Sequence, residues 1–240
     1  MAGTRFSNKL VLVAGGTGGL GRAVSLAFLE EGASVAVTFR RQEEFDALKQ
    51  SAGPQPSLSG HNVDITVDAA VTKMVEAILA NHGRLDVLVN TVGGYKAGMK
   101  FWEQDSQVVD EMLYLNLHSG YTLARAVVPA MLRQGEGAIV NVAAKAALDA
   151  PARAAAYAAS KAAAIAMMNS LAADLKGTGV RVNSVLPSII DTEPNRKAMP
   201  NADFAKWPKP LDIARVILFL CSEDAKVIRG ASIPVYGDSV

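Results

Sequence analysis

The chain has 240 residues, of which half are hydrophobic and a fifth are charged, and its formal net charge is +1. This apolar fraction excludes an intrinsically disordered chain, because enough apolar surface is available to offset the entropy lost on folding. The near-neutral charge, without a run of five like charges, excludes a nucleic-acid-binding stripe and an acidic tail.

The chain organisation predicts a single domain over residues 1–240, since no linker-like stretch rich in Pro, Gly or Ser interrupts it. The single cysteine, Cys221, has no partner for an intramolecular disulfide. The N-terminal residues lack the long apolar stretch of a signal peptide or a membrane helix. We therefore expect a cytoplasmic protein that has neither a membrane nor a nucleic acid as a partner.

Short β-branched runs alternate with longer segments of helical periodicity. The first unit consists of a strand at 10–14, a helix at 20–31 and a strand at 34–39. Alternation of this kind predicts a parallel sheet with right-handed crossovers and helices on both faces, that is, a Rossmann-type doubly wound α/β fold with seven strands. Further strands are expected at 58–63, 85–90, 138–142, 180–186 and 232–236, and further helices at 66–81, 107–133, 154–176 and 211–222.

Two segments differ from this pattern. Residues 143–173 are rich in alanine, which favours either a stable helix or close packing at a subunit interface of a homodimer or homotetramer. Residues 188–210 contain four prolines and no clear periodicity. Long irregular loops in compact domains often cover active sites, so we interpret this segment as a substrate lid.

A glycine-rich loop, Ala-Gly-Gly-Thr-Gly-Gly-Leu-Gly at 14–21, joins the first strand to the first helix. Glycines permit a tight turn and bring backbone N–H groups close to a phosphate, while the helix N-terminus supplies positive potential. This position after a strand and before a helix is typical of dinucleotide binding. The residues expected to contact the cofactor here are Gly15, Thr17, Gly18, Gly19, Leu20 and Gly21.

The glycine spacing fits two registers, through Gly16, Gly18 and Gly21 or through Gly15, Gly19 and Gly21, and the sequence does not separate them. An NTPase P-loop is excluded, because such a loop ends in Gly-Lys-Ser/Thr and here Arg22 follows Gly21.

The end of the second strand carries Arg40 and Arg41. NAD-binding domains normally have an acid there for the ribose 2′-hydroxyl, whereas two cations favour the 2′-phosphate of NADP(H). NADP(H) is therefore the expected cofactor, with NAD(H) as the less favoured one. The alternative interpretation is that both arginines are solvated charges at the start of a helix.

Tyr157 and Lys161 are spaced i, i+4, which places both side chains on one face of the predicted helix at 154–176. An ammonium beside a phenol favours the phenolate, so Lys161 is expected to lower the pKa of Tyr157 toward neutrality. Tyr157 would then exchange a proton with a carbonyl or an imine. An ordinary helix face is the alternative, but the preceding strand should end at the cofactor crevice.

Over its whole length the sequence resembles the short-chain dehydrogenase/reductase family. The residues that carry the resemblance are Gly15, Gly19, Gly21, Asp64, Asn90, Asn116, Tyr157, Lys161 and Pro187, in that order. The resemblance implies catalytic roles for Tyr157, Lys161 and Asn116. It also implies that Asp64 and Ile65 edge the adenine, that Asn90 to Gly93 line the cofactor, that Lys161 holds the nicotinamide ribose, and that the backbone from Pro187 to Ile189 holds the nicotinamide amide.

The largest departure from the family pattern is Ala144, which stands thirteen residues before Tyr157 where the family usually has a serine. That serine donates a hydrogen bond to the substrate carbonyl, and losing an oxyanion donor typically costs about 3 kcal/mol of transition-state stabilisation. Two other motifs also change, to Asn90-Thr91-Val92-Gly93 and to Pro187-Ser188. Ordinary ketone chemistry would need a substitute donor, such as Ser188 or a water molecule.

The quinonoid dihydropteridine reductase branch of the family lacks that serine, and the chain resembles it in three stretches. These are Gly93-Gly94-Tyr95, the run Ala-Lys-Ala-Ala-Leu-Asp at 144–149, and the segment from Asp191 to Trp207. The resemblance implies a flat conjugated imine or quinonoid substrate bound by Tyr95, Ala144 and Tyr157, with Tyr157 as the proton donor. Tyr95, which replaces the tryptophan of that branch, would stack on such a ring or simply pack.

Two rival functions stay open at this point: a ketone reductase or alcohol dehydrogenase of the same family, and a non-catalytic dinucleotide-binding module. A serine hydrolase is disfavoured because the chain has no G-x-S-x-G run. The three histidines, His61, His82 and His118, have no neighbours at metal-ligand spacing, so no metal is expected.

Overall fold

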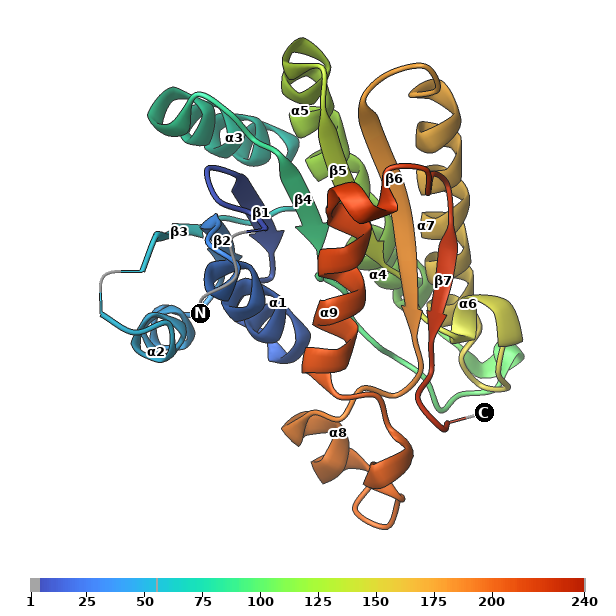
Figure 1. Ribbon diagram of the computed structural model, residues 1–240. Coiled ribbons are helices and arrows are strands. Elements are labelled where there is room, and N and C mark those ends of the chain that lie inside the picture. Colours follow the sequence, from blue (N-terminus) through green and yellow to red (C-terminus); the bar gives the residue numbers. More distant parts are fainter. Residues whose placement is uncertain (1–4, 55, 240) are drawn as a thin grey trace.

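The computed structural model describes residues 5–54 and 56–239. Its parallel strands form a single seven-stranded sheet in the order β3-β2-β1-β4-β5-β6-β7, and helices cover both faces (Figure 1). The predicted Rossmann-type fold is confirmed. The strands are β1 Leu10–Ala14, β2 Ser34–Phe39, β3 Leu58–Asn62, β4 Val87–Asn90, β5 Gly137–Val142, β6 Val180–Pro187 and β7 Ser232–Val235.

The strand order reverses direction between β1 and β4, which lie side by side with Ala14 opposite Asn90. In open α/β sheets, ligands bind beyond the carboxyl ends of the strands at such a switch point. The glycine loop after β1 and the chain after β4 therefore meet at the position where a dinucleotide is expected.

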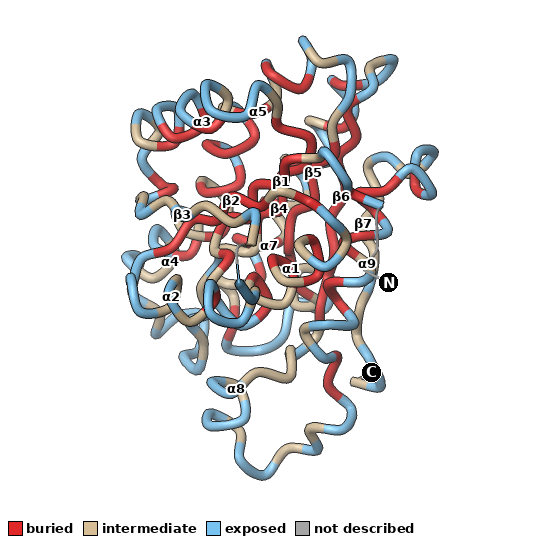
Figure 2. The backbone as a smooth tube through the Cα atoms, turned by 60° about the vertical axis from the view of Figure 1, so that its left-hand side comes forward, coloured by how far each residue is buried: buried red, intermediate tan, exposed pale blue. Residues whose placement is uncertain are grey.

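Two apolar clusters cover the two faces of the sheet, because side chains alternate along each strand. In β1, Val11 and Val13 pack toward α1 and α9, whereas Leu10 and Leu12 pack toward α3, α5 and α7. Figure 2 shows the buried residues concentrated along the strands and the inward sides of the helices. The helices are α1 Gly19–Glu30, α2 Gln42–Ser51, α3 Asp68–His82, α4 Ser106–Leu113, α5 Ser119–Gln134, α6 Ala146–Asp149, α7 Ala155–Asp174, α8 Glu193–Ala198 and α9 Pro210–Cys221.

The structure adds elements that the apolar periodicity did not predict. The helix α2 follows β2 directly, and Leu48 is its only buried residue, so its apolar stripe is too narrow to be recognised. The segment 188–210, expected to be irregular, contains α8, whose N-cap Thr192 accepts a hydrogen bond from the N–H of Asn195. The helix predicted at 107–133 is interrupted by a π-helical turn at Tyr114–His118.

The core also contains Cys221 and the methionines of α7. Cys221 is buried and forms no disulfide, and burial raises the pKa of its thiol to about 12. On the alanine-rich helix α7, Met168 is buried in the cluster with α3 and α5, and Met167 is packed against it. Among the described helices, none is both long and apolar enough to cross a membrane.

Candidate active site

The glycine loop turns sharply at the end of β1. Gly15 has a left-handed φ of 72°, and its N–H donates to the Oγ1 of Thr38 at 2.8 Å. A Cβ built on Gly21 would lie 2.1 Å from the backbone oxygen of Gly15, a distance no side chain tolerates. Only glycine at 21 therefore lets α1 begin this close to the turn and direct its N-terminus at the loop.

Steric contacts also bear on the two glycine registers. A Cβ on Gly18 would have no atom nearer than 3.5 Å, whereas a Cβ on Gly19 would lie 2.9 Å from the Cγ2 of Thr192. Gly16 is needed for packing instead, since a Cβ there would lie 2.5 Å from the Cγ1 of Val37. The requirements at the turn thus fit the register through Gly15, Gly19 and Gly21.

A cavity of about 410 Å³ lies beside this turn. It brings together residues that the sequence placed in one cofactor site although they are far apart in the chain. The predicted cofactor residues that line it are Gly15, Thr17, Gly18, Arg40, Arg41, Ile65 and Gly93. The glycine backbone and the two arginine cations that line this cavity suit a ligand that carries phosphates.

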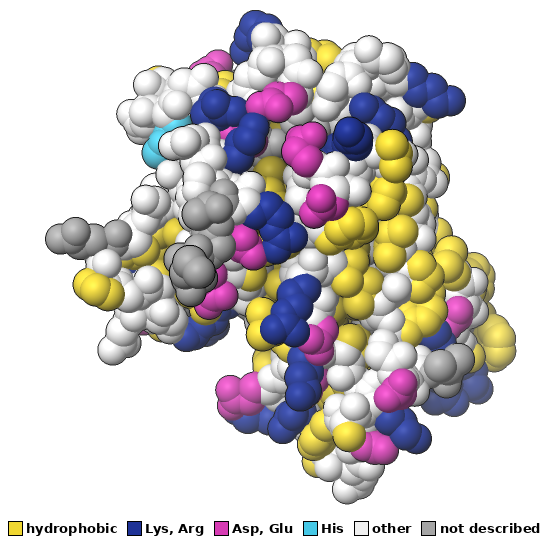
Figure 3. Space-filling view, in the orientation of Figure 1, with side chains coloured by type: hydrophobic (Ala, Val, Ile, Leu, Met, Phe, Trp, Pro, Cys, Tyr) yellow, Lys and Arg dark blue, Asp and Glu magenta, His cyan; other side chains and the backbone are white. Residues whose placement is uncertain are grey.

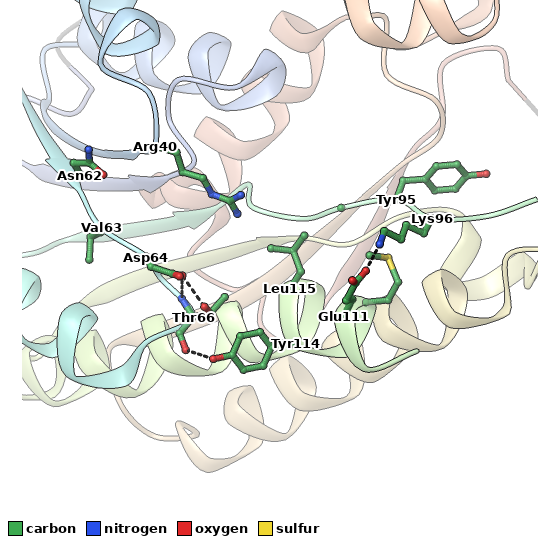
Figure 4. Close-up of a pocket in the computed structure, with 12 residues that line it drawn as sticks. Arg40, Asn62, Val63, Asp64, Thr66, Tyr95, Lys96, Glu111, Tyr114 and Leu115 are labelled. Carbon is green, nitrogen blue, oxygen red and sulfur yellow. Dashed lines mark hydrogen bonds and ion pairs between the residues drawn. The ribbon is translucent and has the colours of Figure 1, made fainter. Parts of the chain in front are cut away.

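A second cavity, of about 590 Å³, adjoins the first and shares Arg40 with it. Figure 4 shows Arg40 directed into this cavity from the end of β2, opposite Asp64 and Thr66. The Oδ1 of Asp64 accepts hydrogen bonds from the N–H and the hydroxyl of Thr66, at 2.9 and 2.6 Å. These bonds, more than the charge of Arg40, hold the pKa of Asp64 below its usual value. Asp64 is therefore a fixed anionic edge of the cavity.

The side chains at the end of β4 form hydrogen bonds within the protein that hold the following loop in place. Asn90 is buried; its Nδ2 donates to the Oδ1 of Asn141 at 3.0 Å and its Oδ1 accepts from the N–H of Val92. Thr91, which belongs to the stretch expected to line the cofactor, donates its hydroxyl to the backbone oxygen of Ala14 at 2.7 Å. Asn90 and Thr91 therefore fix the path of the loop that reaches Gly93.

Asn116 lies in the π-helical turn and is 2% exposed. Its amide pairs with the backbone of Gly94 in both directions, since the N–H of Gly94 donates to Oδ1 at 2.9 Å and Nδ2 donates to the Gly94 oxygen at 3.1 Å. Nδ2 also lies 2.9 Å from the Oγ of Ser160, which itself donates to the backbone oxygen of Tyr157. Asn116 thus connects the loop after β4 to Ser160 of α7.

Tyr157 and Lys161 lie on one face of α7, as predicted, but their electrostatics differ from the prediction. The Lys161 ammonium is buried and donates to the backbone oxygen of Val142 at 2.9 Å. Burial lowers the pKa of Lys161 to about 8. Burial, with a smaller contribution from Tyr95, raises the pKa of Tyr157 to about 12. The predicted lowering of the Tyr157 pKa is therefore wrong, because desolvation dominates and Lys161 is engaged with Val142.

Gly93 joins the cofactor cavity to this pair. A Cβ on Gly93 would lie 2.8 Å from the Oδ1 of Asn116 and 2.9 Å from the Nζ of Lys161. The backbone at this position passes so close to both polar groups that any larger residue would displace one of these side chains. The structure thus brings Gly93, Asn116, Tyr157 and Lys161 into one site.

Of the predicted substrate residues, Tyr95 lies next to Tyr157. The ring of Tyr95 meets that of Tyr157 edge to face, with centroids 4.8 Å apart, and Tyr95 is 69% exposed. Ala144 is buried just beyond the end of β5. Ser188, the suggested substitute for the missing serine, donates its hydroxyl to the backbone oxygen of Tyr236 at 2.7 Å. That hydroxyl proton is therefore already engaged within the protein.

The segment around Pro187 continues the site beyond β6. The backbone oxygen of Pro187 accepts from the N–H of Lys145 at 2.8 Å, which ties this segment to the residue after Ala144. Ile189 is 41% exposed. Sequence reasoning missed Ser160, although its spacing of three residues from Tyr157 on a helix would have indicated a neighbour on that face.

Known proteins of similar sequence indicate the family of this chain. A family model described as short chain dehydrogenase matches residues 9–203. The chain belongs to the short-chain dehydrogenase/reductase family. A D-threitol dehydrogenase of Mycolicibacterium smegmatis is 34% identical to this chain, over 97% of the chain and 93% of that protein. A 3-oxoacyl-[acyl-carrier-protein] reductase of Thermotoga maritima is 31% identical, over 98% and 99% respectively.

A solved structure of this family, ElxO with NADP bound, aligns with a TM-score of 0.89 and 28% identity, covering 95% of this chain and 97% of that one. This member of the short-chain dehydrogenase/reductase family is therefore an oxidoreductase, and its cofactor is a nicotinamide dinucleotide.

Proposed function

We propose that this oxidoreductase uses NADPH to reduce a dihydropteridine or a similar conjugated imine or quinonoid ring. The observation that carries the proposal is Ala144, which leaves the site without the hydroxyl that polarises a simple ketone. A conjugated ring spreads the charge that develops on reduction over several atoms, so a single strong donor matters less. The three sequence stretches that resemble dihydropteridine reductases support the same substrate class.

The arginines at the end of β2 support NADPH as the cofactor. Arg40 and Arg41 both line the cavity beside the glycine turn, where a 2′-phosphate would add negative charge. Gly15, Gly19 and Gly21 would hold the pyrophosphate, Asp64 and Ile65 the adenine, and Lys161 the nicotinamide ribose. When bound, NADPH supplies the hydride.

Tyr157 would donate the proton that completes the reduction. A phenol with a pKa of about 12 is protonated at neutral pH, so it acts as an acid. Lys161, one turn further along α7, would stabilise the phenolate that remains after transfer. Asn116 would keep Gly94 and α7 in register through its bonds to Gly94 and Ser160.

The substrate ring would lie beside Tyr95. The ring of Tyr95 is largely exposed next to Tyr157. Two aromatic rings that pack in offset or edge-to-face geometry gain about 1 kcal/mol of stabilisation beyond that from buried area.

Residues 188–210 would form the lid of a single domain spanning 1–240. Thr192 lies against Gly19, and the backbone oxygen of Lys206 accepts from the N–H of Asp238, so the segment is anchored near the cofactor loop and at the C-terminal tail.

The test is oxidation of NADPH and of NADH at neutral pH, with quinonoid dihydropterin generated in place and a panel of ketones run in parallel. Rapid NADPH oxidation with the pterin and slow oxidation with ketones is the expected result. Turnover of ketones alone would contradict the proposed substrate class, and faster turnover with NADH would contradict the proposed cofactor.

A ketone reductase or alcohol dehydrogenase is the second candidate, and the names of the two relatives described above favour it. Both names denote carbonyl or alcohol chemistry. This function requires another donor in place of the missing serine, and Ser188 is occupied by Tyr236. A water molecule would then have to serve, so ketone activity should rise when a hydroxyl is restored at residue 144. The non-catalytic module is the third candidate, and binding of NADPH without turnover of any acceptor would support it.

We also propose a homodimer or homotetramer, in a reducing compartment such as the cytoplasm. Figure 3 shows hydrophobic side chains gathered over α9 and β7, and α9 carries the exposed Leu211 and Phe219. Exposed apolar patches of this kind often mark subunit contacts. The alanine-rich helix α7 remains the alternative interface. Light scattering that finds only monomer would contradict both.

A further inference from the structure

A third cavity, of about 440 Å³, lies on the outer side of the proposed cofactor cavity. Both cavities are lined by Thr17, Arg41 and Glu44, so these three side chains stand between them. Glu43, the neighbour of Glu44 in the first turn of α2, lines only the outer cavity. The two adjacent carboxylates therefore face different surroundings.

Glu44 is held in this position by two side chains from different elements. Its Oε2 accepts a hydrogen bond from the hydroxyl of Thr17 in the glycine loop, at 3.1 Å. Its Oε1 forms an ion pair with the guanidinium of Arg41, the residue that precedes α2. The Glu44 side chain is 33% exposed, against 72% for Arg41. The carboxylate is thus fixed at the edge of the cofactor cavity.

Because of this ion pair, Arg40 and Arg41 differ in how much positive charge each offers to a cofactor. Arg41 is already neutralised by Glu44, whereas Arg40 forms no ion pair with any residue in 5–54 or 56–239. A 2′-phosphate that approaches Arg41 must share it with Glu44 and meets a like charge there. A ribose 2′-hydroxyl meets an acceptor instead, which is the role an acid at this end of the site plays in NAD-binding domains.

We propose that Glu44 is a specificity-determining residue that limits the preference of this enzyme for NADPH over NADH. Arg40 attracts the 2′-phosphate, while Glu44 repels it and keeps Arg41 in an ion pair. The inference rests on the proposed cofactor site, and it predicts that the charge of Glu44, not its size, narrows the difference in affinity between the two cofactors.

The test compares Glu44→Gln with the matched control Glu43→Gln, using cofactor fluorescence to measure the dissociation constants of NADPH and NADH. Glutamine keeps the size of the side chain and still accepts from Thr17. For Glu44→Gln we expect NADPH to bind about three- to tenfold more tightly, on the scale of a single partly exposed charge pair, with no gain for NADH. Glu43→Gln should shift the ratio of the two constants less than twofold.

A double-mutant comparison separates a specific charge effect from a general one. Arg41→Gln should weaken NADPH binding little in the parent protein and several-fold more in the Glu44→Gln background, because Arg41 is released only there. If Arg41→Gln weakens NADPH binding equally in both backgrounds, the inference is overturned. The same holds if Glu44→Gln changes the ratio of the NADPH and NADH dissociation constants no more than Glu43→Gln does. In both cases the parent protein still binds cofactor. Failure of the parent to bind either cofactor would overturn the proposed function as well. Circular dichroism melting would verify that each variant is folded.

Discussion

The Nζ of Lys161 donates a hydrogen bond to the backbone oxygen of Val142 at 2.9 Å, joining α7 to the last residue of β5. The same ammonium lies 2.9 Å from the point where a Cβ on Gly93 would stand. One buried cation thus faces both a strand end and the loop after β4. Because burial is the cause of its lowered pKa, the ammonium is held at a cost in stability that depends on pH.

The first prediction concerns that cost. The pKa of Lys161 is lowered from 10.5 to about 8 on folding. Below pH 8 the group is therefore protonated in both the folded and the unfolded state, and the full cost of burying the ammonium reduces the free energy of unfolding. Between pH 8 and 10.5 the unfolded chain binds more protons, and the stability contributed by this group rises with pH. Relative to Lys161→Met, the parent should gain stability over this range, by at most about 3 kcal/mol.

Urea unfolding of both proteins between pH 7 and 10 measures this gain as a change in the difference between their free energies of unfolding. The exposed Lys176 supplies the control, since Lys176→Met should give a difference that is nearly constant with pH. A constant difference for Lys161→Met too would show that Lys161 is not desolvated in the folded protein.

The second prediction concerns Tyr157. Tyr157→Phe removes the proposed proton donor and leaves the ring that packs against Tyr95. Because general acid catalysis typically contributes 100- to 10,000-fold, turnover should fall by about that factor while NADPH affinity stays within about twofold. Stopped-flow oxidation of NADPH and a fluorescence titration measure the two quantities. Undiminished turnover would contradict the proposed mechanism.

The third prediction restores the missing hydroxyl. Ala144→Ser should raise kcat/KM for ketones by about 100-fold, the scale of one oxyanion donor, and change pterin reduction little. Ala146→Ser, two residues further along and half-buried, is the matched control and should alter neither activity. If Ala144→Ser leaves ketone turnover unchanged, the absent serine is not what limits this chemistry.

Much of this site follows from short-range rules. The glycine loop after β1 and the i, i+4 spacing of Tyr157 and Lys161 are local patterns, so the sequence predicts their place on a turn and on one helix face. The sheet order places the ends of β1 and β4 together, which accounts for the meeting of Gly15 and Gly93 in one cavity.

The electrostatics of the site could not be predicted in this way. The anchor of Lys161 is a backbone oxygen nineteen residues away, and the raised pKa of Tyr157 depends on how deeply α7 packs. Glu44 went unnoticed because α2 has a single buried side chain, so nothing in the apolar pattern indicates which face of that helix meets the glycine loop. Both properties arise from tertiary burial and long-range contacts rather than local spacing.

The fourth prediction concerns Asn116. Asn116→Ala leaves the N–H and the oxygen of the half-buried Gly94 without their side-chain partner and removes the bond to the buried Ser160, whose hydroxyl still donates to Tyr157. Since an unsatisfied buried polar group costs about 1–3 kcal/mol, the variant should lose about 2–4 kcal/mol of unfolding free energy and most of its turnover. Ser160→Ala removes only one of these bonds and should cost less than half as much, as measured by urea unfolding. Equal losses in the two variants would argue against the link to Gly94.

The last prediction concerns the glycine turn. In Gly21→Ala the new Cβ would lie 2.1 Å from the backbone oxygen of Gly15, so either α1 or the turn must move. In Gly18→Ala the nearest atom would be 3.5 Å away. We expect Gly21→Ala to lose about 2 kcal/mol or more of unfolding free energy, on the scale of an overpacked core, whereas Gly18→Ala should lose under about 1 kcal/mol. Unfolding without added cofactor measures the steric effect alone. Similar losses for the two variants would mean that the turn relaxes freely and that Gly21 is not required by its contact with Gly15.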